Sequence, residues 1–347
     1  MSGGITQLIA VGAQDTHLVG NPEVSFFRST YRRHTNFSQT VERQIIQGAI
    51  ASNGMSTIRF ERKGDLLGFV YFTCKNNNEA KKVNWADRIS KVELLIGGQV
   101  IDEHTYDFSS RIATEAMAGT FAKSPSGGMY TGGSNDAYFY PLRFFFCENY
   151  QTALPLVALQ YHDVELRITW GGSIPGGDVI ECFANYVYLD TQERKEMANS
   201  SHSMLITQVQ RSVASNGKVQ ELNFNHPIKF LASSNTLVES ALCSTTNRVK
   251  LQINGTDVTE YKFSAPNFTA ISSYYNTPFM NGNEVGMFMY PFCLDTSKLQ
   301  PTGSLNFSRL DSARLVSETD SIRTDVYAVN YNILRIENGL GGLVYAN

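Results

Sequence analysis

The six histidines are the side chains best suited to bind a metal ion or to move a proton near neutral pH. They lie at His17, His34, His104, His162, His202 and His226. None of them forms an HxH or HExxH pattern, which is typical of histidine-based metal centres. His162 stands next to Asp163, and we interpret the two as a pair at a sheet edge rather than as ligands. The histidines therefore predict no metal site.

The cysteines are the next candidates, because a thiolate can attack a substrate or bind zinc. The five cysteines lie far apart, at Cys74, Cys147, Cys182, Cys243 and Cys293. Their number is odd and no CxxC pair occurs, so neither a zinc site nor a redox motif is indicated. We expect buried free thiols in a reducing cytosol.

Three short motifs resemble known sites but lack the context that those sites need. The GLGG run beginning at Gly339 follows the last expected strand and has no helix after it, so it is no dinucleotide loop. Gly303–Ser304 lacks the elbow pattern of a nucleophilic serine. The SNGK run beginning at Ser215 lacks the leading glycine of a phosphate loop. We therefore predict no catalytic residue, no metal, no cofactor and no enzymatic activity.

Length and composition favour two domains with a broad contact surface. The chain has 347 residues, of which 42% are hydrophobic, 12% aromatic and only 18% charged. Such a chain can form two cores, and its many aromatic residues suit β-sheets. The net charge is −3, so no general attraction to nucleic acid is expected. The basic cluster Arg28, Arg32 and Arg33 is too short to change this expectation.

The sequence gives no sign of a targeting or membrane segment. Residues 1–20 lack the basic start and the long apolar run of a signal peptide. No apolar run reaches the roughly 18 residues that a membrane helix needs. Without a signal peptide we expect no glycosylation at the N-x-[ST] sequons, which begin at Asn36, Asn199, Asn254, Asn267 and Asn306.

The stretch from Tyr140 to Trp170 organises the predicted fold. We expect its first part, up to Phe146, to be an aromatic strand buried on both faces. Its last part, Val164–Trp170, alternates apolar and polar residues and predicts a strand with one buried face. Between them, ALPLVALQ from Ala153 is expected to form one or two helical turns that carry the chain from one sheet to another. This arrangement predicts a β-sandwich.

Further elements of the first half surround this stretch. A capping-box pattern, Asp190 with Glu193, predicts a helix at the end of this half. The other expected elements are a strand at Ile58 and Phe60, a strand over Leu66–Cys74, a hairpin turn at Gly97–Gly98, a helix over Ser109–Gly119, a loop over Ala122–Asn135 and a last strand over Val179–Leu189.

The second half repeats this order of signals. Three pairs of segments match, with offsets that fall from 157 to 150 to 145 residues: Lys91–Asp102 with Arg248–Thr259, Tyr140–Pro141 with Tyr290–Pro291, each expected to open an aromatic strand, and Asn185–Tyr186 with Asn330–Tyr331. The first pair carries a hairpin turn in each copy, Gly97–Gly98 and Asn254–Gly255. Three matches in one order predict a single all-β domain used twice.

We divide the chain on this basis into an arm, residues 1–24, a first domain with a linker helix, residues 25–198, and a second domain, residues 199–347. Strands of the second domain are expected over Met204–Gln210, Lys218–Phe224 and Ile228–Ala232, in MFMYPFCL and in VYAVNYNILRI. Leu305 and Phe307 are expected to point into its core.

Six motifs in the chain resemble one known family. They are Gly3–Phe37, Ala153–Ile168, Leu189–Arg194, Phe224–Leu231, Leu299–Leu315 and the end of the chain from Val326. Together they cover nearly the whole chain and resemble the major capsid proteins of nucleocytoplasmic large DNA viruses, in particular the algal-virus branch. Many members are longer, with large surface insertions in the second half that this chain lacks.

The resemblance implies an all-β fold of two tandem eight-stranded jelly-roll sandwiches with short connecting helices. It also implies a homotrimeric, pseudo-hexagonal capsomer that tiles an icosahedral virus shell. The implied partners are neighbouring capsomers and minor capsid and penton proteins, with an internal membrane nearby that is not spanned and no direct binding of nucleic acid. The implied location is the capsid shell of the virion, assembled in the host cytoplasm.

Two alternatives from other classes stay open at this point. A carbohydrate-binding, lectin-like jelly-roll protein would need a sugar site, which the sequence does not reveal. A jelly-roll hydrolase would need a catalytic group, and none was identified. For the arm, whose apolar residues include Ile5, Leu8 and Ile9, we expect a position against a neighbour or a minor protein on the inner side of the shell.

Overall fold

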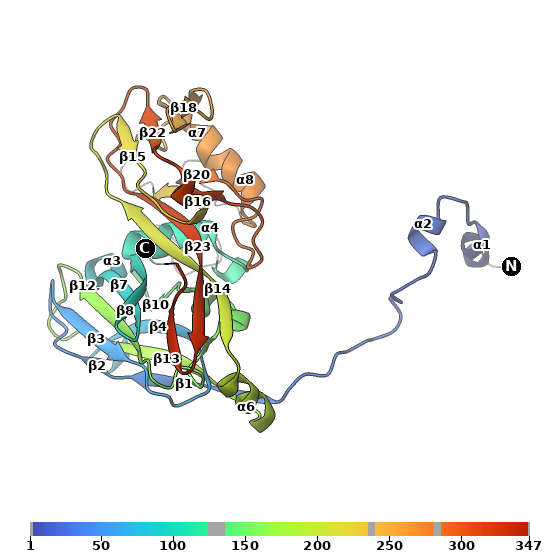
Figure 1. The fold of residues 1–347 in the computed structure, drawn as a ribbon, viewed down its shortest axis with the longest axis horizontal. Coiled ribbons are helices and arrows are strands. Elements are labelled where there is room, and N and C mark those ends of the chain that lie inside the picture. The colour runs from blue at the N-terminus through green and yellow to red at the C-terminus, as the bar shows by residue number, and fades with distance from the viewer. Residues whose placement is uncertain (1–2, 124–135, 235–239, 280–285, 346–347) are drawn as a thin grey trace. The chain divides into compact units, whose positions relative to one another are not determined.

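The computed structural model describes residues 3–123, 136–234, 240–279 and 286–345 (Figure 1). Its contacts divide the chain into two units, Met1–Asn36 and Phe37–Asn347. The first unit contains two short helices, α1 (Gly3–Ile9) and α2 (Thr16–Val19), in which no residue is buried. The strands of the first sandwich begin at Phe37, later in the chain than the predicted start near Ser25.

The first sandwich is built from two antiparallel sheets. One has the strand order β1-β13-β4-β10, with β5 and β11 also pairing with β4, and the other has the order β2-β3-β12-β7-β8. The strands are β1 (Phe37–Gln44), β2 (Ile46–Gln47), β3 (Met55–Arg59), β4 (Leu66–Asn76), β5 (Glu79–Ala80), β7 (Ile89–Ile96), β8 (Gln99–Thr105), β10 (Phe139–Pro141), β11 (Leu154–Pro155), β12 (Val164–Trp170) and β13 (Val179–Leu189). Two short strands, β6 (Val83–Asn84) and β9 (Asp136–Ala137), pair with each other in a separate ladder. Helix α3 (Trp85–Arg88) connects β6 to β7.

The second sandwich has the same construction. One sheet has the order β14-β23-β16-β20, with β21 on β16 and β24 on β23, and the other has the order β15-β22-β17-β18, with β19 on β17. The strands are β14 (His202–Ser212), β15 (Val219–Glu221), β16 (Pro227–Ser234), β17 (Arg248–Ile253), β18 (Thr256–Asp257), β19 (Lys262–Phe263), β20 (Met287–Pro291), β21 (Leu305–Asn306), β22 (Ala313–Ser317), β23 (Val326–Glu337) and β24 (Leu340–Leu343).

The strand orders of the two sandwiches correspond, except that the first has an additional edge strand, β2. In one sheet of each sandwich, β1-β13-β4-β10 corresponds to β14-β23-β16-β20, and in the other sheet β3-β12-β7-β8 corresponds to β15-β22-β17-β18. This is the topology of an eight-stranded jelly roll. Figure 1 shows the two sandwiches, with helix α4 (Ala113–Ala116) between them. The predicted all-β double jelly roll with short connecting helices is confirmed.

The two predicted hairpins are confirmed at equivalent places. Gly97 and Gly98 have φ of 58° and 81°, and Asn254 and Gly255 have φ of 49° and 77°. Positive φ at both central residues matches the type I′ turn, which suits the twist of the flanking strands. Each turn joins strands that are neighbours in the sheet, β7 with β8 and β17 with β18.

The Tyr-Pro pairs are equivalent, but they end their strands. Tyr140–Pro141 closes β10 and Tyr290–Pro291 closes β20, whereas we expected each pair to open a strand. Proline has no N–H to continue a ladder of hydrogen bonds, which explains its place at a strand end.

The predicted aromatic strand over Tyr140–Phe146 is therefore wrong beyond Pro141. The chain leaves the sheet and forms helix α5 (Phe145–Glu148) and a 3-10 turn, η3 (Tyr150–Thr152). Phe144, Phe145 and Phe146 are all buried. A short run that is apolar on every side has the same pattern in a buried strand and in a buried helical turn, so periodicity could not distinguish them.

The ALPLVALQ segment does carry the chain from one sheet to the other. It begins with β11, which pairs with β4 of the first sheet, and it leads into β12 of the second sheet. The backbone N–H groups of Ala158 and Leu159 donate to the carbonyls three residues earlier, at 3.2 Å each. The segment thus contains a short strand and one tight turn in place of the one or two helical turns expected.

Strand β12 follows the predicted alternation. Val164, Leu166, Ile168 and Trp170 are buried and belong to the core of the first sandwich, whereas the residues between them are half-buried. The Trp170 indole N–H donates to the Ser56 hydroxyl at 2.8 Å, so the one polar group of this buried face is satisfied. The predicted strands over Leu66–Cys74 and Val179–Leu189 are likewise confirmed as β4 and β13.

The linker helix α6 (Thr191–Asn199) is present, but the predicted capping box is not formed. Asp190 precedes the helix with extended backbone, and its side chain accepts no capping hydrogen bond. The helix start is held by Arg194, whose guanidinium contacts the Asp65 carboxylate at 2.8 and 2.9 Å. Asp65 also accepts the Leu189 N–H at 2.8 Å. A tertiary ion pair has replaced the local cap.

The predicted helix over Ser109–Gly119 is confirmed as a π-helical turn, η1 (Phe108–Ile112), followed by α4. The second sandwich has a matching segment after β19, formed by α7 (Ser264–Pro266), η4 (Asn267–Ile271) and α8 (Ser272–Asn276). Of the loop predicted over Ala122–Asn135, a 3-10 turn, η2 (Phe121–Lys123), is described, and residues 124–135 lie outside the described residues.

Phe307 is a core residue of the second sandwich, as predicted. It is 3% exposed, and its ring lies 6.2 Å from that of Phe224 and 5.8 Å from that of Phe292. It stands in a 3-10 turn, η5 (Phe307–Arg309), directly after β21. Leu305 is only half-buried and packs against the same core.

Replacing Phe307 by Ala should lower the free energy of unfolding by about 3–5 kcal/mol, because it leaves a cavity among packed rings. Urea unfolding followed by tryptophan fluorescence and circular dichroism would measure the loss. Leu294→Ala, at a side chain that is 77% exposed, is the matched control and should change stability by less than about 0.5 kcal/mol. Equal stability of the Phe307→Ala variant and the parent would contradict the assignment.

Candidate assembly surfaces

The histidines do not come together as a metal centre. In the part of the chain that the structure describes, no group of three or more His, Cys, Asp or Glu side chains could hold a metal ion. His104 is buried, with its Nε2 2.9 Å from Asp102 and its ring stacked 4.5 Å from that of Phe144. Its surroundings are those of a packed core residue.

His162 is not paired with Asp163 as predicted. Asp163 forms ion pairs with Arg59 at 2.5 Å and Arg62 at 3.6 Å. The His162 ring reaches the second sandwich, where its Nδ1 lies 2.8 Å from the Gly341 carbonyl oxygen and 3.1 Å from the Gly341 nitrogen. The sequence neighbours point to different partners because adjacent residues of an extended segment face opposite sides.

The cysteines are free, and none is an activated nucleophile. Four are buried and Cys147 is half-buried. Burial raises the pKa of every thiol, for Cys147 and Cys243 to about 12. At neutral pH these groups are protonated thiols, which attack substrates and bind metals poorly.

The two sandwiches meet at an apolar junction that was not predicted from the sequence. The helical segment Phe108–Ala116 of the first sandwich packs on the outer face of the β14-β23-β16-β20 sheet. Its residues Phe108, Ile112, Ala113 and Ala116 are fully buried there. The sheet contributes six further residues, each at most 3% exposed: Phe230, Ala232, Met287, Met289, Tyr327 and Val329.

Hydrogen bonds between the two sandwiches surround this apolar junction. The Thr105 and Tyr327 hydroxyls lie 2.8 Å apart, and the Ser234 hydroxyl donates to the Asp107 carboxylate. The Val209 N–H donates to the Asp102 carboxylate at 2.9 Å. Burial of an apolar side chain contributes on the order of 1.5–3 kcal/mol, so a junction of this size holds the two sandwiches as one body.

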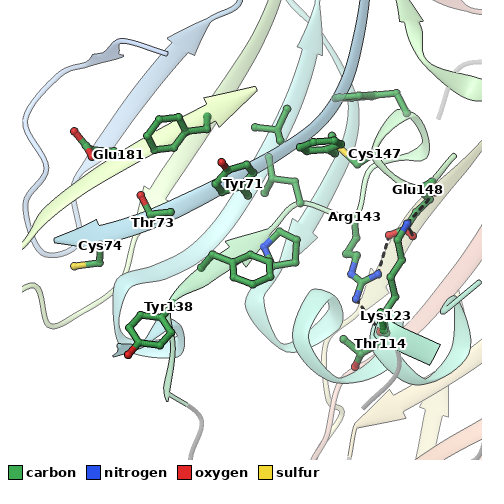
Figure 2. Close-up of a pocket in the computed structure, with 18 of the residues that line it drawn as sticks. Tyr71, Thr73, Cys74, Thr114, Lys123, Tyr138, Arg143, Cys147, Glu148 and Glu181 are labelled. Carbon is green, nitrogen blue, oxygen red and sulfur yellow. Dashed lines mark hydrogen bonds and ion pairs between the residues drawn. The ribbon is translucent and has the colours of Figure 1, made fainter. Parts of the chain in front are cut away.

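The corresponding sheet of the first sandwich has a different outer face. There, the β1-β13-β4-β10 sheet carries an open hollow of about 940 Å³. Aromatic rings form its floor, with Tyr71 at 5.5 Å from Phe183, 6.2 Å from Phe139 and 6.3 Å from Phe69 (Figure 2). The Phe139 side chain is 42% exposed. Exposed aromatic floors of this kind are typical of protein contact sites.

The charged groups around the hollow are paired with one another. Glu148 receives hydrogen bonds from Arg143 at 3.0 Å and from Lys123 at 3.2 Å, as Figure 2 shows. Glu181 forms ion pairs with Lys75 at 2.7 Å and Arg43 at 3.3 Å. With these carboxylates neutralised, the hollow suits apolar side chains of a partner better than acid–base chemistry.

The sequence contained a partial signal for the hollow. Leu66–Cys74 has apolar residues on both faces, and the inner ones, such as Val70 and Phe72, belong to the core. For the outer residues, Phe69 and Tyr71, the sequence did not show which segment would pack on them. Periodicity identifies an apolar face without identifying the element that covers it.

Two jelly rolls joined through a helix-on-sheet junction define a double jelly-roll protein, with an aromatic contact surface left on one roll. The family described as "Major capsid protein N-terminus" matches residues 25–190, and "Large eukaryotic DNA virus major capsid protein" matches residues 232–342. The chain belongs to the family of major capsid proteins of large eukaryotic DNA viruses.

Relatives of known identity agree along their full length. The chain is 34% identical to the major capsid protein of Pyramimonas orientalis virus and 30% identical to that of Paramecium bursaria Chlorella virus 1, with 100% of both chains covered in each case. The predicted family and its algal-virus branch are confirmed.

Solved structures give the same result. A PBCV-1 capsid protein superimposes with a TM-score of 0.78 at 26% identity, covering 93% of this chain and 100% of the other. The Faustovirus major capsid protein superimposes with a TM-score of 0.60 at 10% identity, with 94% of each chain covered, which supports the fold alone. The protein is therefore a major capsid protein, a structural component of the virion shell.

Among the described residues, no helix has both the length and the apolar character to cross a bilayer.

The raised thiol pKa values predict that the native protein reacts slowly with a thiol reagent at pH 8, because little thiolate is present. Absorbance of the released chromophore would follow the reaction with Ellman's reagent. The chain unfolded in guanidinium is the control, and all five cysteines should react there. A native thiol that reacted at the rate of the unfolded chain would contradict the assignment of inert cysteines.

Proposed function

We propose that this capsid protein forms homotrimeric, pseudo-hexagonal capsomers that tile an icosahedral shell around the DNA of a large virus. The observation that supports this proposal is the repetition of one jelly-roll topology in two sandwiches that pack against each other. Three such chains supply six equivalent rolls, and six similar blocks around an axis give a hexagonal outline that fills a surface without gaps. A closed ring also covers sheet faces that would be exposed in one chain.

The proposed partners follow from this role. Neighbouring capsomers would contact the rim of each trimer, and minor capsid and penton proteins would fill the joints of the shell. An internal membrane would lie nearby without being spanned, and assembly would take place in the host cytoplasm. With a net charge of −3, the protein is not expected to bind nucleic acid directly, and we propose no metal or cofactor.

We retain the division into an arm, residues 1–24, a first jelly roll with linker helix, residues 25–198, and a second jelly roll, residues 199–347. In the arm, Leu8 is 82% exposed and Ile9 is 70% exposed. Apolar side chains so exposed gain stability when another protein covers them. We propose that the arm lies against a neighbour or a minor protein on the inner side of the shell.

The mass of the purified protein tests the trimer. Size-exclusion chromatography with light scattering should give three times the chain mass of 38.6 kDa. Electron microscopy of assembled particles should then show hexagonal blocks. A monomer that binds immobilised sugars would support the lectin-like alternative and contradict the proposal.

Deleting residues 1–24 should spare the trimer and its melting temperature but reduce the yield of closed particles. No described residue of the arm belongs to either core, so its loss should affect contacts between capsomers alone. Light scattering and particle counts by electron microscopy measure the two effects. A truncated chain that is monomeric or unfolded would place the arm in the core, and particles at normal yield would remove its role in the lattice.

A further inference from the structure

The helical segments that lie between β8 and β10 in the first roll and between β19 and β20 in the second roll are equivalent. In the first roll, η1 begins at Phe108 and continues into α4. In the second roll, η4 begins at Asn267 and continues into α8. Both consist of a five-residue π-helical turn and a short α-helix, and equivalent positions lie 159 residues apart. The contacts of the Phe108–Ala116 segment can therefore be compared with the exposed side chains of the η4–α8 segment.

One face of this segment is sealed in the first roll and open in the second. Phe108, Ile112 and Ala116 form a stripe at spacing i, i+4, i+8 and are completely buried in the junction. The equivalent stripe of the second roll carries Ile271, which is 44% exposed, and Tyr275, which is 74% exposed. Among the described residues, these two large side chains are thus partly and mostly exposed, respectively.

The opposite face of the second segment shows that its orientation is preserved. Phe268 is only 7% exposed and belongs to the core of its own roll. The equivalent position of the first roll, Ser109, is also buried, at 3% exposure, so the same side of the helix is turned inward in both rolls. The exposure of Ile271 and Tyr275 follows from a missing partner rather than from a helix that is turned over.

For the outer sheet faces the relation is reversed, because the face of the second roll is buried and that of the first roll is exposed. Strand pairing places Tyr71 between Pro141 and Phe183 in the first roll, and the equivalent Phe230 between Pro291 and Val329 in the second. By the same pairing, Phe139 and Thr73 correspond to Met289 and Ala232. In the second roll, Phe230, Met289 and Ala232 are buried beneath the Phe108–Ala116 segment. In the first roll, Tyr71, Phe139 and Thr73 line the open hollow.

We propose that the η4–α8 segment of one copy docks in the aromatic hollow of a neighbouring copy and so repeats the junction found within each chain. This inference rests on the proposed trimer and identifies the surfaces that would form it. The contact is head-to-tail, since each copy offers a helix at one place and a hollow at another. Such contacts form a closed ring when the rotation permits, and three copies would close a ring of six rolls.

Size and chemistry suit this occupant. Tyr275 takes the place of Ala116, so the second helix has a longer side chain to fill an open hollow. A buried aromatic side chain covers roughly 150–250 Å² and gains further from edge or offset contacts with other rings. Thr73 and Glu181 line the hollow and can accept the hydrogen bond that a buried tyrosine hydroxyl needs.

Two single substitutions test the proposal from its two sides. Tyr275→Asp alters the helix and Phe139→Asp alters the hollow, and both positions are exposed within one chain, so the fold of the monomer should persist. A carboxylate buried in an apolar contact should raise the concentration at which the trimer dissociates by about 100-fold or more. Light scattering over a dilution series measures this, with circular dichroism as the check on folding. Val219→Asp, at a 42% exposed position of β15, is the matched control and should remain trimeric.

Mixing the two variants gives a sharper result. The Tyr275→Asp copy keeps an intact hollow and the Phe139→Asp copy keeps an intact helix, so one sound contact can form between them. The expected product is a one-to-one dimer that cannot close a ring. Folded variants that remain trimeric like the parent would overturn this inference and leave the trimer itself intact. A monomeric parent would overturn the proposed function and the inference together.

If Tyr275→Asp does not fold, Ile271→Lys on the same stripe serves as the second variant and should show the same loss of trimer. A folded Ile271→Lys protein with unchanged dissociation would count against the proposal.

Discussion

The packing of the Phe108–Ala116 helix against the outer face of the second roll is the contact on which the rest of the molecule depends. It buries large apolar side chains from two domains that are otherwise complete sandwiches. Hydrogen bonds at its edge, from Thr105 and Asp107 among others, fix the angle between the rolls. The proposed capsomer would need that angle to be constant, because small errors would accumulate around a ring and across a lattice.

The two rolls share one topology but differ in the surfaces that they leave open. In the second roll, the helical segment Phe108–Ala116 covers the outer sheet face, to which Phe230 and Met289 belong. In the first roll, the equivalent face is an aromatic hollow, and its charged groups are paired. The same architecture thus provides a finished contact within the chain and leaves the surfaces that we propose for a second contact between copies. The divergence lies in what covers each surface rather than in the strands.

The surroundings of the cysteine, histidine and acidic side chains agree with a structural role. Burial keeps the cysteine thiols protonated, and His104 is enclosed by aromatic rings. The carboxylates around the hollow, Glu148 and Glu181, are bound to basic side chains. Stability and contact area, which aromatic residues supply, are the properties that a virion shell requires.

The sequence by itself determined the strands with clear alternation, such as Val164–Trp170, the hairpins at Gly97–Gly98 and Asn254–Gly255, and the internal repeat. These features are local: side-chain period and turn residues specify them with few distant contacts. The tertiary structure alone decided that the chain leaves the sheet after Pro141 and that Arg194 binds Asp65 in place of a helix cap. It also decided which apolar faces are sealed and which stay open, because the cover of a face comes from residues far away in the sequence.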